Sequence, residues 1–140
     1  MNRSPIHMAA MLIGLGFLAA GVGGFIPGIT TNAGDIAMYG HDSPAKLLGI
    51  FQVSVLHNVI HLVFGLAGLL LARSAAKVYL IGGGLIYLVT WLYGVIIDPT
   101  SGLNFVPLDD ADNWLHLGAS AAMVLLGVTL GKSSTPAAQA

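Results

Sequence analysis

Two pairs of polar residues stand at helical spacing inside apolar stretches of this chain. His57 and His61 are four residues apart, and so are Asp112 and His116. Side chains at this spacing project from the same face of a helix, one above the other. Ionisable side chains within membrane segments are costly and normally face the interior of a bundle or a partner. The two pairs are therefore the candidate site.

Three kinds of chemistry suit these residue types. Three imidazoles and one carboxylate match the ligand preferences of zinc, iron and copper, which would make His57, His61, His116 and Asp112 metal ligands. A histidine also serves as the axial ligand of a haem or a chlorophyll, and opposed histidines on two helices can clamp one macrocycle. A proton relay is the third interpretation, but the inner half of the apolar stretches holds few of the polar groups that a relay needs.

A structural role is the alternative to all three. Histidine and asparagine side chains form hydrogen bonds between membrane helices, and each bond stabilises the bundle by about 0.6–2 kcal/mol. Asn58 follows His57 directly and Asn113 follows Asp112, so both asparagines belong to the candidate polar network. In this interpretation Asp112 is the N-cap of the last helix. Both interpretations, a ligand site and a polar network, stay open at the level of the sequence.

The surrounding sequence indicates a membrane protein. Of the 140 residues, 56% are hydrophobic and 8% are charged, and the mean hydropathy is +0.84. Soluble domains carry about a quarter charged residues. Four apolar stretches, at about 8–26, 51–72, 78–97 and 113–130, are each near the roughly 20 residues that cross a bilayer as a helix. The sequence therefore predicts an all-α membrane protein, with a single four-transmembrane-helix bundle over 1–132 and a flexible cytoplasmic tail over 133–140.

The stretches form two predicted helical hairpins, which are joined by a short turn at 73–77. Each hairpin has a longer outer loop, 27–50 or 98–112, rich in glycine, proline, aspartate and asparagine. Within the first loop, Ser43–Phe51 is expected to form a helical turn near the outer surface.

A weak internal repeat relates the two hairpins. Three residues of the second stretch match three of the fourth in register, namely Asn58, His61 and Leu62 with Asn113, His116 and Leu117. A duplication with a pseudo-two-fold axis along the membrane normal would give such a match, but the rest of the two halves aligns poorly, and the question stays open.

Basic residues predict the orientation of the bundle. Four of them lie in places that four helices put on one side of the membrane: Arg3, Arg73, Lys77 and Lys132. The positive-inside rule then gives both termini inside. Counting about 1.5 Å per residue from these charges, His57 and His116 lie about 24 Å from the inner boundary and His61 about 18 Å from it. The candidate site is thus expected in the outer half of the bundle.

Composition excludes several classes of function. A net charge of −1 offers no basic face for nucleic acid. The absence of cysteine removes disulfides, thiolate metal sites and cysteine nucleophiles. No pairing of a nucleophile with a base and no phosphate-binding loop is evident in the sequence. Nineteen glycines, many inside the apolar stretches, favour close helix packing and offer faces for a membrane-protein partner or a second copy of the chain.

The residues around both motifs resemble one known family. The runs Leu48–Val53, His57–Leu62 with Gly65 after it, and Asp112–Leu117 occur in this order. Together they are similar to the signature of small bacterial membrane proteins that share a domain of unknown function, numbered forty-three eighty-three. The resemblance implies a four-helix bundle in the bacterial plasma membrane. It implies no activity and no role for the motif residues.

From these observations we expect a small multi-pass protein of the plasma membrane without catalytic function. It would be an accessory subunit or a binding component of a membrane complex, with the lipid bilayer and a membrane protein as its partners. The alternative is a metal-, haem- or chlorophyll-binding membrane protein that uses the intramembrane histidines.

Overall fold

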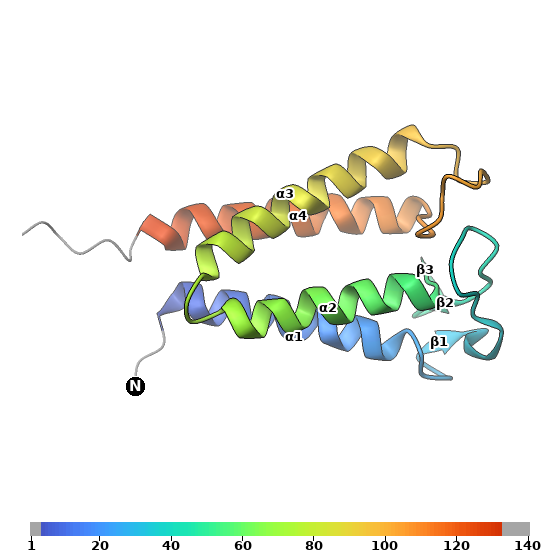
Figure 1. Cartoon of the computed structure of the whole chain (residues 1–140), viewed down its shortest axis with the longest axis horizontal. Coiled ribbons are helices and arrows are strands. Elements are labelled where there is room, and N and C mark those ends of the chain that lie inside the picture. Colours follow the sequence, from blue (N-terminus) through green and yellow to red (C-terminus); the bar gives the residue numbers. More distant parts are fainter. Residues whose placement is uncertain (1–3, 133–140) are drawn as a thin grey trace, which may run out of the picture.

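Four helices dominate the fold. The computed structural model describes residues 4–132, so Arg3 and the predicted tail, 133–140, lie outside the described part. The helices are α1 (Pro5–Gly23), α2 (Val55–Leu71), α3 (Ala76–Ile96) and α4 (Asp110–Lys132). The loop between α1 and α2 holds three short strands and one 3-10 turn: β1 (Thr30–Thr31), η1 (Ala33–Asp35), β2 (Lys46–Leu47) and β3 (Phe51–Gln52). The predicted helical bundle is confirmed (Figure 1).

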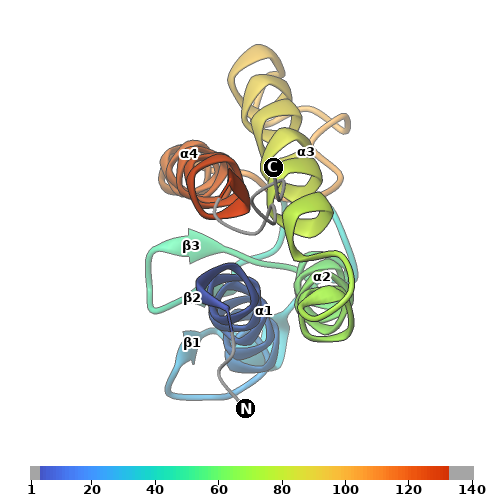
Figure 2. The same ribbon diagram turned by 90° about the vertical axis from the view of Figure 1, so that its left-hand side faces the viewer.

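The helices lie side by side as two hairpins. α1 packs along α2 and α3 packs along α4, whereas helices of different hairpins touch at few points. Figures 1 and 2 show the two pairs next to each other, with the loops of both hairpins at one end of the molecule. The first described turn of α1 and the last turn of α4 lie together at the opposite end. The bundle therefore has a terminal end and a loop end.

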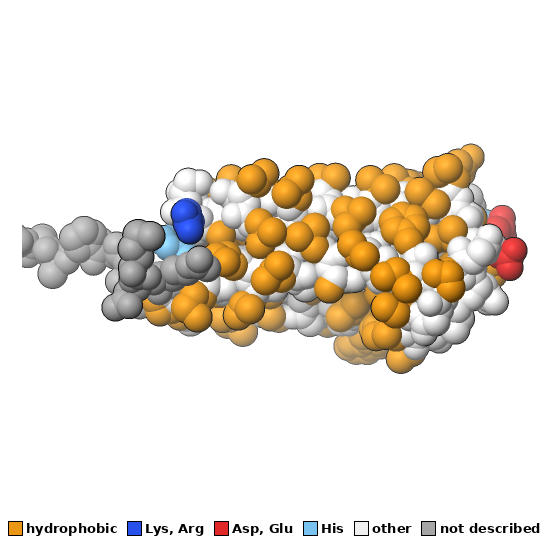
Figure 3. All heavy atoms as spheres, turned by 90° about the horizontal axis from the view of Figure 1, so that it is seen from below, with side chains coloured by type: hydrophobic (Ala, Val, Ile, Leu, Met, Phe, Trp, Pro, Cys, Tyr) orange, Lys and Arg blue, Asp and Glu red, His pale blue; other side chains and the backbone are white. Residues whose placement is uncertain are grey.

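Length and composition make three helices able to cross a membrane, namely α1, α3 and α4. α2 is apolar but has 17 residues, which at about 1.5 Å per residue is slightly shorter than a hydrocarbon core of about 30 Å. On the face shown in Figure 3, hydrophobic side chains cover the middle, basic ones lie at the terminal end and acidic ones at the loop end. These features indicate a membrane protein.

The helical turn expected over Ser43–Phe51 is wrong. β2 and β3 pair antiparallel as a hairpin, with Leu47 opposite Phe51, and β1 pairs antiparallel with β2. Leu48 and Gly49 in the hairpin turn have φ of +53° and +72°, in the left-handed region that a right-handed helix does not use. Because Phe51 and the residue after it are held in β3, α2 begins at Val55 and not near Phe51.

Glycines set the close approach within each hairpin. A Cβ placed on Gly14 of α1 would lie 2.9 Å from the backbone oxygen of Gly65 in α2, and one placed on Gly84 of α3 would lie 3.1 Å from the backbone oxygen of Ser120 in α4. Part of the glycine faces that the sequence offered to partners is thus used inside the chain. A partner protein stays a prediction.

The weak repeat has a counterpart in the packing. Asn58 lies against Gly24 at the loop end of the first hairpin, and Asn113 lies against Gly94 at the loop end of the second. A Cβ on either glycine would overlap the asparagine side chain. An asparagine therefore packs against a glycine at the same place in each hairpin. This extends the match from α2 and α4 to α1 and α3, the helices that precede them.

Adding one methyl group at Gly14 tests the close packing of α1 against α2. In Gly14→Ala the new Cβ meets backbone atoms that cannot rotate away, so α1 and α2 must separate, and we expect a loss of about 1–3 kcal/mol of stability. Gly16→Ala is the matched control, because nothing lies within 4 Å of a Cβ there, and alanine favours the helix by about 0.5–1 kcal/mol. Thermal unfolding in detergent, followed by circular dichroism, measures both. Equal stabilities of the two variants would contradict the packing described here.

Candidate functional site

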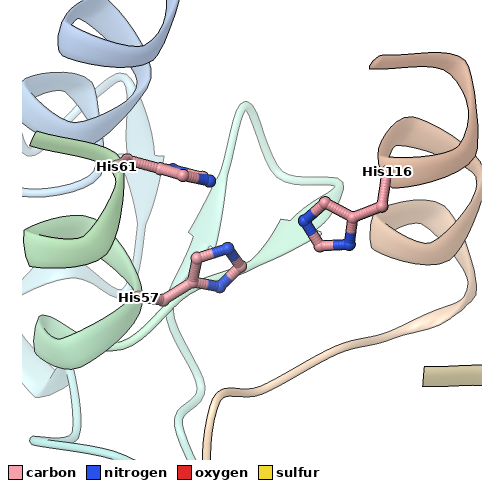
Figure 4. A group of neighbouring side chains, drawn as sticks. All are labelled: His57, His61 and His116. Carbon is pink, nitrogen blue, oxygen red and sulfur yellow. The ribbon is translucent and has the colours of Figure 1, made fainter. Parts of the chain in front are cut away.

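Three histidines converge between the two hairpins. Ligand nitrogens of His57 and His61 on α2 and of His116 on α4 all lie within 4.8 Å of one another. The ring centroid of His57 lies 4.6 Å from that of His61 and 6.1 Å from that of His116. The residues are 2%, 7% and 3% exposed. Figure 4 shows the rings of α2 facing the ring of α4 across the gap between the helices. The spacing of each pair in the sequence thus has its spatial counterpart.

The first turn of α2 holds His57 in place. Ser54 is the N-cap of α2, and its Oγ accepts a hydrogen bond of 3.1 Å from the backbone N–H of His57. The imidazole of His57 also interacts with the backbone carbonyl groups of Gln52 and Pro107, which belong to the loops of different hairpins. Ser54 is three residues before His57, a spacing that is typical of an N-cap.

Asp112 has a structural place beside the histidines. α4 begins at Asp110, so Asp109 occupies the N-cap position, and the expectation that Asp112 is the N-cap is wrong. The Oδ1 of Asp109 accepts a hydrogen bond of 3.0 Å from the N–H of Asp112, while Oδ2 of Asp112 accepts one of 3.1 Å from the N–H of Asp109. This exchange is a capping box. The same Oδ2 accepts a bond of 3.1 Å from the N–H of Gln52 in β3.

These contacts distinguish Asp112 from the three histidines, with which it was predicted to bind a metal. The group of converging ligand atoms in the described part of the chain consists of His57, His61 and His116. One oxygen of Asp112 instead holds two backbone N–H groups, and it ties β3 of the first hairpin to α4 of the second.

An ion pair adds a second tie at the loop end. Lys46 Nζ in β2 lies 3.1 Å from Oδ2 of Asp109. Burial opposes ionisation of Asp109, but the hydrogen bond from the N–H of Asp112 and the ammonium group of Lys46 outweigh it and hold the pKa of Asp109 below its usual value. Lys46 is the one basic residue of the sequence that does not belong to the four on the predicted inner side.

The two asparagines of the predicted network lie at the edges of the site. Nδ2 of Asn113 donates a hydrogen bond of 3.1 Å to the backbone oxygen of Gly94, which joins α4 to α3. Asn58 is fully buried against Gly24, and within residues 4–132 neither its Oδ1 nor its Nδ2 has a hydrogen-bond partner. One asparagine thus forms the predicted bond between helices, whereas the other fills space between them.

Aromatic residues that the sequence did not single out form the floor of the site. The rings of Phe17, Phe64 and Tyr87 pack on one another with centroids 4.9–5.2 Å apart. Phe17 also packs on His61 and Tyr87 on His116, at 5.7 and 5.1 Å. Beyond this floor, towards the terminal end, lies the apolar core that contains Leu80 and Met123 among others. The repeat could have indicated two of these rings, because Phe17 and Tyr87 precede Gly24 and Gly94 by the same interval.

Two cavities flank the histidines. One, of about 290 Å³, lies between α2 and α3 and is lined by all three histidines. The other, of about 300 Å³, lies between α1 and α4 and is lined by His61 and His116. Tyr87 also lines both. The cavities therefore exist where the hairpins meet loosely, and they share a wall made of His61, His116 and Tyr87.

The histidine nitrogens have unused binding capacity. Nδ1 of His57, His61 and His116 is buried, and within the described residues none of the three has a hydrogen-bond partner. A neutral imidazole has one nitrogen lone pair for a proton donor or a metal ion. Leaving a buried polar atom unpaired costs about 1–3 kcal/mol. The arrangement is therefore suited to a metal ion or to a ligand that exchanges hydrogen bonds with imidazole.

Comparison with known proteins shows the family. The model of the Domain of unknown function (DUF4383) matches residues 7–129. The chain belongs to this family. The resemblance noted from the two histidine motifs is thereby confirmed. No curated protein and no solved structure matches the chain.

The Asp109 contacts lead to a testable dependence on pH. Because the pKa of Asp109 is lowered in the folded state, its carboxylate stabilises the protein fully above the ordinary aspartate pKa of about 3.9, and this contribution is lost as the pH falls through the lower folded-state pKa. Asp109→Asn keeps a capping side chain but removes the charge. We expect this variant to unfold at a lower temperature than the unaltered protein near neutral pH, with the difference disappearing in acid. Lys46→Met should show the same convergence, and a difference that persists in strong acid would contradict the assignment.

Proposed function

We propose that this protein binds one transition-metal ion inside the membrane through His57, His61 and His116. The observation that supports this proposal is the convergence of three buried imidazoles, contributed by two hairpins, with ligand nitrogens within 4.8 Å of one another. Three histidine ligands with a fourth position left for another ligand are a familiar set for zinc. Imidazole also suits copper, iron and nickel.

The distances favour a single ion. Two nitrogens that are each about 2.1 Å from one ion lie at most about 4.2 Å apart. The present limit of 4.8 Å exceeds this value by an amount that small rotations of the imidazole rings can close. Asp112 does not belong to the proposed ligand set, because one of its oxygens holds the N–H groups of Gln52 and Asp109.

A macrocycle is the less favoured ligand of the same histidines. The rings of His57 and His61 are in contact, with centroids 4.6 Å apart, and the free space beside them is divided into two cavities and not joined as one slot. A haem or chlorophyll needs a continuous flat space next to its axial histidine. An ion needs only the point at which the three rings meet.

The proposed setting is a multi-pass protein of the plasma membrane with four spans and both termini inside. α2 then crosses the bilayer together with the short segment that precedes it, and the loop end faces outward. The basic residues Arg73, Lys77 and Lys132 at the terminal end support this orientation through the positive-inside rule. In this setting the protein is a binding component, and an accessory role in a larger membrane complex is the form of that function we favour.

Metal analysis tests the proposal. The protein, purified in detergent and incubated separately with Zn²⁺ or Cu²⁺, should retain about one ion per chain after desalting, as measured by mass spectrometry of the elements. His61→Ala and His116→Ala should lose this metal. Metal at about 100 times its Kd should also stabilise the unaltered protein by about 2.7 kcal/mol.

His7→Ala and His41→Ala are the matched controls, because neither residue belongs to the converging group. Both should bind as much metal as the unaltered protein. Retention of stoichiometric metal in His61→Ala and His116→Ala, or a protein that binds neither ion, would reject the proposed site. An absorption band of a bound tetrapyrrole that is lost in the same two variants would assign the histidines to the macrocycle instead.

A further inference from the structure

The cavity between α2 and α3 has the features of a ligand pocket that opens to lipid. Its volume of about 290 Å³ is near the lower end of the range for small-molecule sites, about 300–1,000 Å³. Ile86 and Val89 of α3, which line it, are 58% and 64% exposed. In a membrane these exposed side chains face acyl chains. The pocket is thus reached sideways from the bilayer.

The end of this pocket that lies furthest from the lipid carries the polar atoms. His57, His61 and His116 line it, each is more than nine-tenths buried, and Nδ1 of each has no partner within residues 4–132. The hydroxyl groups of Thr90 and Tyr93, which also line it, donate to the backbone oxygens of Ile86 and Leu103. Free hydrogen-bonding capacity therefore remains at the histidines and at the neighbouring hydroxyl group of Tyr87.

The rest of the wall is apolar and rich in aromatic rings. It includes Phe64, Tyr87, Tyr93 and Phe105, and flat rings pack well between such side chains. No lysine, arginine, aspartate or glutamate is among the described residues that line the pocket. A charged ligand would therefore lose its hydration without gaining an opposite charge. The pocket suits a ring compound without charge.

We propose that this pocket binds an uncharged, membrane-soluble ring compound with carbonyl or hydroxyl oxygens, the chemistry of a quinone or quinol. The ring lies among the aromatic side chains, and one oxygen points to the histidines. An imidazole N–H or the open position of a bound ion can each meet that oxygen. The proposal therefore goes beyond the metal site and does not depend on it.

The second cavity provides an internal comparison. It lies between α1 and α4, has nearly the same volume, and is reached by His61 and His116 but not by His57. Its wall has Gly16 and Ala20 where the corresponding positions of α3, counted from Gly94 instead of Gly24, have Ile86 and Thr90. Because it lacks His57 and most of the aromatic wall, it should not hold the same ligand.

Blocking each cavity in turn tests the assignment. The protein is placed in nanodiscs of an uncharged phospholipid and titrated with decylubiquinone, and binding is measured by calorimetry with correction for partition into lipid. We expect saturable binding of one molecule per chain. Ile86→Trp, which fills the α2–α3 cavity, should weaken binding at least about tenfold. Gly16→Trp, which fills the other cavity, should leave the affinity unchanged. Val89→Trp is the second blocking variant if Ile86→Trp does not fold.

Two further comparisons decide the chemistry. Decylbenzene, which has a ring and the same tail but no oxygen, should show no saturable binding. His57→Phe should weaken the binding of decylubiquinone about tenfold, because the buried acceptor or donor is lost.

Titrations of chelator-treated and of zinc-loaded protein separate this proposal from the metal site. Saturable binding to the treated protein supports the pocket even if no ion is retained. Non-saturable partition, equal binding of decylbenzene, or equal effects of Ile86→Trp and Gly16→Trp would overturn it.

Discussion

Backbone contact at glycine is the constraint on which the rest of this structure depends. In lipid no hydrophobic force draws helices together, so close packing and dispersion must do so. Gly14 and Gly65 let α1 and α2 touch through their backbones, and Gly84 does the same for α3 against α4. Each hairpin is therefore a tight unit, whereas the contacts between hairpins are few. The histidines and both cavities occupy this looser seam, where space for a ligand costs the least packing.

Between the helices, the seam holds a layer of three converging imidazoles. His57, His61 and His116 form a layer that lies above three stacked aromatic rings, and below these rings the core is apolar. The aromatic floor of Phe17, Phe64 and Tyr87 separates the imidazoles from the core of the terminal half. A site for binding fits this layer better than a path for conduction.

The sequence was sufficient for the helices and for the meeting of the histidines, because period and spacing are local signals. His57 and His61 share a face through helix geometry alone, and apolar length predicts the spans. The small sheet was not predictable in this way, since strands of two residues are too short to show alternation. Nor were the contacts of Asp112, whose partner Gln52 is 60 residues away in the chain. Tyr87 is one of many apolar residues in its helix, and the signal that sets it apart is its interval to Gly94, which equals that of Phe17 to Gly24.

The bond between Asp112 and the N–H of Gln52 couples the loop end to the interior of the bundle. This bond holds the two hairpins together. On one side, β3 leads through Ser54 into the first turn of α2, which contains His57; on the other side, Asp112 lies one helical turn before His116. The backbone oxygen of Phe105 and the N–H of Gly40 link the two loops in the same region, at 2.7 Å. The distance between the histidines of α2 and the histidine of α4 is therefore set at the loop end. A molecule that binds to the loops and shifts one hairpin relative to the other would therefore widen or narrow the spacing of the imidazoles.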